Sequence, residues 1–161
     1  MPDESTRDSY LLPVDGIGTY VKTGYKLDDL YASLGSLPSQ SITVFLDACF
    51  SGANRSGEML VPSLRGVVIK ANSSAPRGNV VGFSAAHANE TAVPYNDESH
   101  GMFTYYLLKK LQETGGNVSY QELSEYIHRN VRQQSSVIGK TQTPTVIPSS
   151  IVGDNWKGWR F

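Results

Sequence analysis

The sequence predicts an α/β fold with a small, mainly parallel sheet that is flanked by helices. Two unbroken apolar runs, 42–46 and 79–85, lack the alternation of half-exposed strands, which is typical of strands buried on both faces of a parallel sheet. Segments with apolar residues at helical spacing precede the first run and follow the second. Because no internal repeat or composition break divides the 161 residues, we expect a single domain.

Two short elements are predicted before the first buried strand. Residues 10–16 form a brief edge strand or hairpin arm that stops at an Asp-Gly turn. Asp28 can cap a helix that leads directly into the strand, as in half of a crossover unit. The apolar face of this helix consists of three leucines at helical spacing, Leu30, Leu34 and Leu37, and Gly35 lies near its end.

Two further helices and a short strand follow the second buried strand. The first helix ends at Gly115-Gly116, and the second begins with a capping box of Ser119 and Glu122. The apolar face of the first consists of Phe103, Leu107, Leu108 and Leu111, and that of the second consists of Tyr120, Leu123, Ile127 and Val131. Residues 144–152 can supply one more short strand, whereas residues 53–78, rich in Gly, Ser, Asn and Pro, predict a long loop.

Composition excludes several classes of partner. The net charge is -1 and no basic run stands out, so we expect no nucleic-acid partner. No apolar stretch approaches the roughly 20 residues of a membrane span, and the polar string after Met1 is not a signal peptide. A lone cysteine cannot form an internal disulfide, which suits a reducing compartment. We therefore expect a cytoplasmic chain without a membrane partner.

The end of the first buried strand carries the functional signal. The apolar run continues into Asp47, Ala48 and Cys49, and ligands of α/β sheets bind outside the carboxyl ends of strands. A lone cysteine is commonly a small buried hydrophobe, but this one follows the strand and precedes a Ser-Gly turn that would expose it. Cys49 is therefore a candidate nucleophile, which needs a base or a positive field to form its thiolate.

Asp47 is not the activator of Cys49, because a nearby negative charge disfavours a thiolate. Two residues apart on an extended chain, Asp47 and Cys49 point to the same side. The carboxylate is best explained as a receptor for a cationic group of the substrate. The alternative is a helix cap or an ordinary surface charge.

Residues 46–52, LDACFSG, resemble the Asp-Ala-Cys-His-Ser-Gly box of caspase-like cysteine peptidases, in the metacaspase and bacterial paracaspase-type branch. Phe50 stands where histidine is common. Further fragments resemble that family in the right order, namely 10–15, 27–30, and 83–86 with 101–104. The resemblance implies a caspase-hemoglobinase α/β fold and the hydrolysis of peptide or protein substrates by a Cys-His dyad. No zinc spacing or phosphate loop points to another class.

The resemblance also implies roles for single residues. Cys49 would be the catalytic nucleophile, and Asp47 and Ser84 would contact the substrate. Caspases proper carry glutamine where Asp47 stands and cleave after aspartate. By resemblance and by charge, Asp47 therefore predicts cleavage after arginine or lysine. Self-cleavage in the long loop is a further hypothesis, since the loop contains Arg55, Arg65, Lys70 and Arg77.

One departure from the family pattern concerns the general base. The family's catalytic histidine stands in a His-Gly pair roughly 50 residues before the cysteine, a position that falls at or before Met1. Residues 1–161 are thus expected to be the C-terminal portion of a single caspase-like catalytic domain, inactive alone. Without the neighbouring strands, the edge of the first buried strand would be open, so the expected partners are the missing N-terminal segment or a second copy.

The three histidines and the acidic pair 28–29 complete the survey. His100-Gly101 copies the His-Gly pair, but it follows the cysteine and opens a helix, so it is a poor candidate for the base. His87 lies in a polar loop, and His128 is expected to be a solvated residue or one matched to the dipole of the last helix. Asp28 and Asp29 match a calcium-binding pair of some metacaspases but lack companion ligands, so we expect no cofactor, with calcium as the alternative. Two classes stay open: a cysteine endopeptidase part and a non-catalytic caspase-like binding or assembly module.

Overall fold

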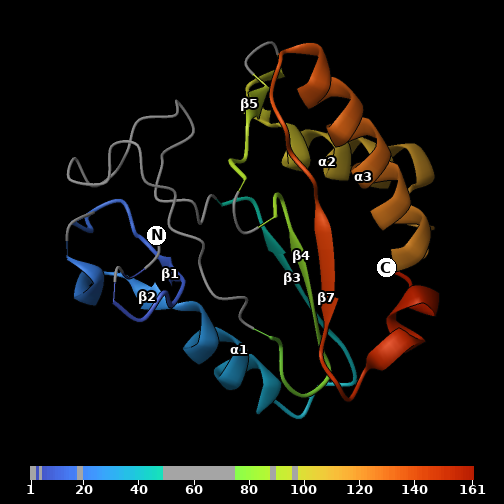
Figure 1. Ribbon diagram of the computed structural model, residues 1–161. Coiled ribbons are helices and arrows are strands. Elements are labelled where there is room, and N and C mark those ends of the chain that lie inside the picture. The colour runs from blue at the N-terminus through green and yellow to red at the C-terminus, as the bar shows by residue number, and fades with distance from the viewer. Residues whose placement is uncertain (1–2, 4, 18–19, 49–74, 88–89, 96–97) are drawn as a thin grey trace.

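The structure is a computed structural model that describes residues 3, 5–17, 20–48, 75–87, 90–95 and 98–161 (Figure 1). The strands are β1 (Tyr10–Leu11), β2 (Tyr25–Lys26), β3 (Ile42–Leu46), β4 (Val80–Ser84), β5 (Pro94–Tyr95), β6 (His100–Gly101) and β7 (Thr145–Pro148). The helices are α1 (Leu27–Gly35), α2 (Met102–Thr114) and α3 (Tyr120–Val137), with short 3-10 helices η1 (Val21–Thr23) and η4 (Gly153–Gly158).

The central sheet has the order β3-β4-β7 among the described strands. β3 runs parallel to β4, with Leu46 opposite Ser84, and β4 runs antiparallel to β7, with Ser84 opposite Thr145. The predicted strands at 42–46, 79–85 and within 144–152 are therefore confirmed. The described sheet is mixed, and a parallel arrangement holds only for its β3–β4 pair.

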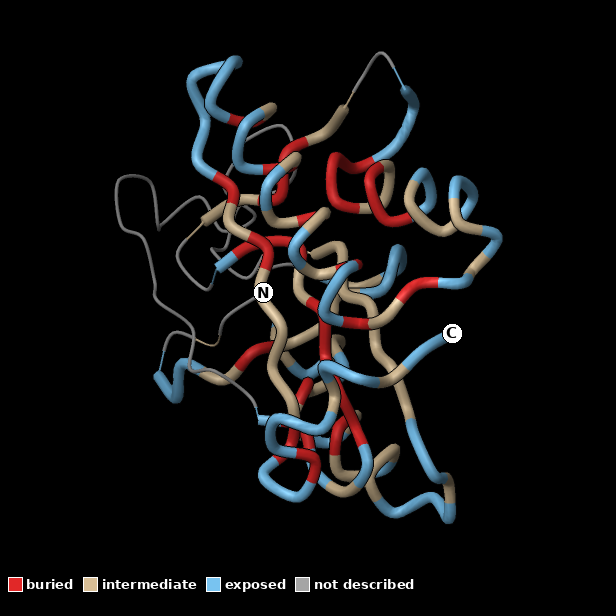
Figure 2. Tube along the Cα trace, turned by 90° about the vertical axis from the view of Figure 1, so that its right-hand side faces the viewer, coloured by how far each residue is buried: buried red, intermediate tan, exposed pale blue. Residues whose placement is uncertain are grey.

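Helices cover both faces of the sheet, and Figure 2 shows the buried residues gathered along its strands and the facing sides of the helices. On one face, Val81 and Phe83 of β4 pack with the buried residues of α2 and α3. On the other face, Val80 packs with Leu27 and Tyr31 of α1. β4 is buried along four of its five residues, whereas every residue of β3 is only half-buried. The expectation that 42–46 is buried on both faces was wrong, because β3 pairs with β4 alone among the described strands.

The first helix ends near Gly35 as predicted, but its start and its apolar face differ from the sequence prediction. Lys26 is its N-cap and forms no side-chain cap, so Asp28 lies within the first turn instead. The helix ends at Gly35, which leaves Leu37 beyond it and 52% exposed. Leu27 and Tyr31, one turn apart, are the residues that the helix buries.

The two later helices follow the prediction more closely. Ser119 and Glu122 form the expected capping box at the start of α3, and all four residues of its predicted apolar face are buried. Gly115 adopts the left-handed conformation at the end of α2, with φ at 59°. Leu108 was wrongly assigned to the core face of α2, because it is 47% exposed.

Aromatic side chains of the C-terminal segment cover the α3 side of β3. The ring of Phe161 stacks on Tyr120 at 4.5 Å and on Phe45 at 6.0 Å between centroids. The hydroxyl of Tyr120 in turn contacts the hydroxyl of Thr43. These contacts keep the outer strand of the described sheet attached to the α3 layer.

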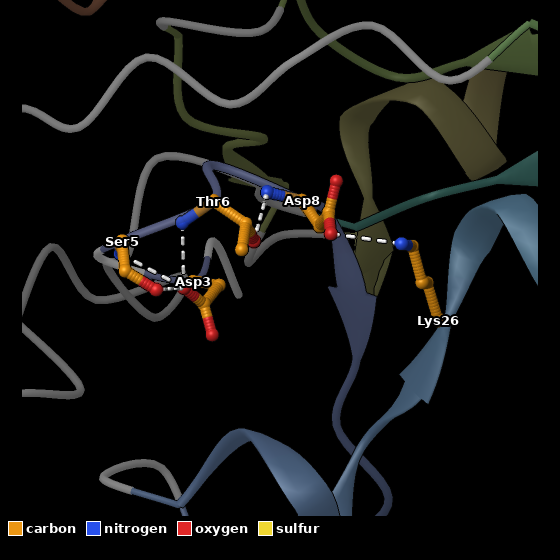
Figure 3. A network of polar contacts seen from close by, with 5 residues as sticks. All are labelled: Asp3, Ser5, Thr6, Asp8 and Lys26. Carbon is orange, nitrogen blue, oxygen red and sulfur yellow. Dashed lines mark hydrogen bonds and ion pairs between the residues drawn. The ribbon is translucent and has the colours of Figure 1, made fainter.

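Polar contacts attach the N-terminal residues to β2 (Figure 3). Oδ1 of Asp3 accepts hydrogen bonds from Ser5 and from the Thr6 amide, which lowers the pKa of Asp3 to about 2, with the Ser5 hydroxyl as the largest cause. Asp8 forms an ion pair of 2.8 Å with Lys26, and the hydrogen bond from Lys26 lowers the pKa of Asp8. Both carboxylates stabilise this arrangement above their ordinary pKa, and the contribution is lost as the pH falls through the lowered values.

Gly82 lies where β4 crosses α1, which gives the first prediction. A Cβ at this position would lie 2.5 Å from the Tyr31 hydroxyl oxygen, and Tyr31 is 3% exposed, with burial raising its pKa to about 12. Gly82→Ala should therefore lower the free energy of unfolding by about 1–3 kcal/mol in urea denaturation. Tyr31→Phe removes the clashing oxygen and should recover most of that loss.

Gly158→Ala is the matched control, since no atom lies within 4 Å of the Cβ it would add. It should change the free energy of unfolding by no more than about 0.5 kcal/mol. If Gly82→Ala costs the same with and without the Tyr31→Phe substitution, the packing described for β4 and α1 is contradicted.

Candidate active site

The carboxyl ends of β3 and β4 lie side by side, as the parallel register requires. The Ala85 amide donates a hydrogen bond of 2.8 Å to the Leu46 carbonyl, which extends the pairing by one residue. Asp47 follows β3 and Ala85 follows β4, so the chain leaves both strands at the same edge of the sheet. This is the edge at which α/β sheets bind ligands.

Asp47 is held against the start of α2. The Thr104 hydroxyl donates a hydrogen bond of 2.5 Å to Oδ2 of Asp47, while Oδ1 is buried from solvent. The N-cap of α2, Gly101, forms no side-chain cap of its own. A carboxylate at this place suits the positive end of the helix dipole. Asp47 thus ties the end of β3 to the first turn of α2.

Gly101 is the residue that allows this approach. It is buried, and a Cβ on it would lie 2.9 Å from Cγ of Asp47 and would overlap the carboxylate oxygens. No larger residue fits without displacing Asp47 or the start of α2. The position of Asp47 therefore depends on a glycine 54 residues further along the chain (101 − 47 = 54).

Ser84 shares this edge of the sheet but projects differently from Asp47. Its hydroxyl donates a hydrogen bond of 3.1 Å to the Ala86 carbonyl. The preceding residue, Phe83, packs in the α2 and α3 layer, so strand alternation directs Ser84 toward the α1 face. Asp47 contacts α2 on the opposite face. The structure places both predicted substrate-binding residues at one edge, and their side chains leave the sheet on opposite faces.

Cys49 lies outside the described residues, as do Arg55, Arg65 and Lys70 of the predicted loop. Its placement on the same side as Asp47 stays a prediction from sequence spacing. Arg77 is described and exposed, and its backbone packs against Gly35 at the end of α1.

The histidines lie in three different places. His100 is exposed in β6 and directly precedes Gly101, so it lies near the Asp47 edge but does not open α2 as expected. His87 is exposed after β4. His128 is half-buried, with Nδ1 3.1 Å from the Pro144 carbonyl oxygen, so of the two expectations for it the solvated one was wrong, and a match to the helix dipole stays a prediction.

A separate cavity of about 490 Å³ opens between α3, β7 and η4. Its apolar wall includes Phe83, Phe103, Val146 and Trp156, and His128 lies at its margin. Neither Asp47 nor Ser84 lines it, although Thr145, the strand partner of Ser84, does. This cavity is therefore distinct from the edge at which Asp47 lies.

The described residues contain no group of three or more His, Cys, Asp or Glu side chains that could hold a metal ion. Asp28 and Asp29 lie in the first turn of α1, where the helix dipole favours carboxylates. Calcium binding by this pair stays a prediction. No helix within the described ranges has both the length and the apolar character needed to cross a membrane.

Sequence reasoning missed the residues that hold the edge together. Thr104 and Gly101 were noticed only as part of a family-like fragment, without a role. Gln142 was not noticed, yet it is fully buried and bonds to Ala85 and Val93. A single glutamine in a polar segment gives no local signal of burial.

The family model of the caspase domain matches residues 2–155. The chain belongs to the caspase domain family. Its fold is similar to the crystal structure of protein GSU0716 from Geobacter sulfurreducens, with a TM-score of 0.62 and 19% identity. That match covers 99% of this chain and 65% of the Geobacter chain, so this chain spans less than two thirds of that relative. No curated protein matches the chain. Family membership confirms the resemblance to caspase-like proteins, whereas the metacaspase branch stays a prediction.

The contact between Thr104 and Asp47 gives the second prediction. Thr104→Val removes the hydroxyl donor from a partly buried carboxylate and should lower the free energy of unfolding by about 1–2 kcal/mol. Thr104→Ser keeps the donor and should cost less. Urea denaturation of the purified chain measures both.

Thr114→Val is the control within the same helix, because the Thr114 hydroxyl donates only to backbone carbonyls of α2, those of Lys110 and Leu111. In an Asp47→Ala background, Thr104→Val should lose most of its effect, since the two residues interact directly. Additive effects of Thr104→Val and Asp47→Ala would show that the bond contributes nothing to stability.

Proposed function

We propose that this caspase-family domain is part of a cysteine-type endopeptidase in which Cys49 is the nucleophile and Asp47 selects arginine or lysine before the scissile bond. The observation that carries the proposal is the place of Asp47. It lies at the carboxyl end of β3, fixed against α2, and Cys49 follows it by two residues in the sequence. Family membership over residues 2–155 supports cysteine peptidase chemistry.

In the proposed reaction the Cys49 thiolate attacks the peptide carbonyl carbon. The tetrahedral intermediate collapses to a thioester as the amine leaves with a proton from the general acid, and water then hydrolyses the thioester. The thiol proton must first pass to a base. None of the three histidines precedes the cysteine as the family's His-Gly pair does. We infer that the base comes from a segment outside this sequence and that the isolated chain is inactive.

Asp47 suits a cationic side chain for electrostatic reasons. Unit charges 4 Å apart attract by about 4 kcal/mol at an effective dielectric constant of about 20, against about 1 kcal/mol in bulk water. A carboxylate accepts several hydrogen bonds, so it can bind Thr104 and a guanidinium together. Thr104 also fixes the orientation of the carboxylate before substrate arrives. Ser84 would contact the substrate backbone at the same edge of the sheet.

A non-catalytic binding or assembly module is the second candidate. One observation favours it: β3 pairs with β4 alone among the described strands and so presents an open edge. A strand of the missing N-terminal segment or of a second copy could pair there. In this reading Asp47 has a structural role at the start of α2. For the endopeptidase a cytoplasmic setting is part of the proposal, because the single cysteine must stay reduced to act as the nucleophile.

The third prediction tests the endopeptidase with a longer protein that contains this domain and its His-bearing segment. Asp47→Asn should lower kcat/KM for arginine and lysine peptides by about 10–100-fold, because it removes the charge and keeps the side-chain shape. Cleavage of a matched neutral peptide should change by less than about threefold. Cys49→Ala should abolish all cleavage and any self-cleavage in residues 53–78.

The isolated 161-residue chain is measured alongside the longer protein and should cleave none of these peptides. Removing the base that activates a cysteine nucleophile lowers the rate of cleavage by several orders of magnitude. If Asp47→Asn kept the full preference for arginine and lysine peptides over the neutral peptide, Asp47 would have no role in substrate recognition. An inactive longer protein that still binds partners through β3 would favour the assembly module. Cys49-dependent cleavage by the isolated chain would make His100→Ala the next variant.

A further inference from the structure

We propose that Gln142 is a positioning residue that fixes Asp47 at the carboxyl edge of the sheet, and through it the preference for basic substrates. The specificity part of this inference rests on the proposed function. The positioning part rests only on contacts among described residues. Gln142 precedes β7, on the far side of β4 from Asp47, and is 0% exposed.

The side-chain oxygen and nitrogen of Gln142 each bind the backbone at one end of the segment that follows β4. Oε1 accepts a hydrogen bond of 2.8 Å from the Val93 amide, and Nε2 donates one of 2.9 Å to the Ala85 carbonyl. The Val93 amide can only donate and the Ala85 carbonyl can only accept, so the orientation of the side-chain amide is determined. A buried amide without such partners is costly. Gln142 therefore joins Ala85 and Val93, at the two ends of the segment that follows β4, and we call these two hydrogen bonds the clamp.

The two hydrogen bonds of Gln142 join two series of contacts that both reach Asp47. We call the closed path the ring. On one side, the Ala85 amide donates to the Leu46 carbonyl, one residue before Asp47. On the other side, the Met102 amide donates a hydrogen bond of 3.0 Å to the Val93 carbonyl at the start of α2. The first turn of α2 then holds Asp47 through Thr104. The Gln142 side chain thus links the β4 side of this ring to its α2 side.

A neighbouring contact strengthens the clamp. The amide and hydroxyl of Thr143 donate hydrogen bonds of 2.6 and 2.9 Å to the two carboxylate oxygens of Glu90. Glu90 lies within the clamped segment, and Oε2 also accepts a 3.3 Å hydrogen bond from the His87 amide. Gln142 and Thr143, before β7, therefore hold Ala85, Glu90 and Val93.

Loss of the two Gln142 hydrogen bonds should change the orientation of the Asp47 carboxylate, although Gln142 is not in direct contact with it. When Val93 loses its partner, the Met102 amide loses a fixed acceptor, and the first turn of α2 can move relative to β3. Gly101 leaves no spare room beside the carboxylate, so a small shift there changes the orientation of Asp47. Binding of a guanidinium depends on that orientation, whereas chemistry at the thiol does not.

Amide hydrogen exchange tests the ring in the 161-residue chain. Gln142→Met keeps the length of the side chain and removes both hydrogen bonds, and Gln133→Met makes the same change at an exposed position. In Gln142→Met, the Val93 and Met102 amides should exchange about tenfold faster or more, while those of Leu123 and Ile127 in α3 change by less than about twofold. Gln133→Met should change none of the four.

Gln142→Glu, measured at a pH at which the glutamate is ionised, keeps the test decisive if Gln142→Met does not fold, since the carboxylate retains an acceptor for Val93 and offers no donor to Ala85. It should leave the Val93 amide protected and still loosen Ala85. Unchanged exchange at Met102 in folded Gln142→Met would overturn the proposal, because the ring would not reach α2, and unchanged exchange at Ala85 in Gln142→Glu would overturn it on the β4 side. Equal acceleration of all four amides would also overturn it, because Gln142 would then support stability alone.

Kinetics in the longer protein test the consequence for specificity. Gln142→Met should raise KM for arginine peptides by about fivefold or more, with kcat and the cleavage of neutral peptides nearly unchanged. Equal loss on basic and neutral peptides would overturn the specificity role. If the parent protein cleaves no peptide at all, the proposed function fails, and the hydrogen-exchange result still decides the positioning role.

Discussion

The contact between the Asp47 carboxylate and the first turn of α2 is the constraint on which the candidate site depends. It joins the end of β3 to a helix that begins 55 residues later (102 − 47 = 55), through the Thr104 hydroxyl and the close approach of Gly101. A charged group in this half-buried place needs a donor and a favourable dipole, and α2 supplies both. The same contact that stabilises the fold therefore orients the one carboxylate next to the candidate nucleophile in the sequence.

The rest of the domain holds β3 and α2, the two elements that this contact joins, in fixed relative positions. β4 is the most buried strand and aligns β3 through the parallel pairing that ends at Leu46 and Ser84. Phe83 anchors β4 to the layer of α2 and α3, and Gly82 admits Tyr31 of α1 on the opposite face. Gln142 then connects the segments that leave these elements. Stability and site geometry thus share the same residues, so variants at this edge should affect both.

Sequence patterns correctly predicted the features that depend on residues adjacent in the chain. The apolar runs located β3 and β4, and Ser119 with Glu122 located the start of α3, because strand burial and capping depend on adjacent residues. The exposure of Leu108 and Leu37 and the half-buried state of β3 could not be predicted in this way, since they depend on which elements pack alongside. Asp47 was found from its place after a strand. Gln142 was not, because its partners lie 49 and 57 residues away.

Our central prediction is that Asp47 places a negative charge beside Cys49, and thiol labelling tests it without any need for catalysis. Cys49 is the only cysteine, so mass spectrometry can follow its reaction with a cationic trimethylammonium-ethyl and an anionic sulfonato-ethyl methanethiosulfonate. Each reagent forms a mixed disulfide with the thiolate and releases methanesulfinate. The ratio of cationic to anionic rates should fall about tenfold in Asp47→Asn, equivalent to about 1.4 kcal/mol. An unchanged ratio would show that Asp47 does not face Cys49 and would contradict the account.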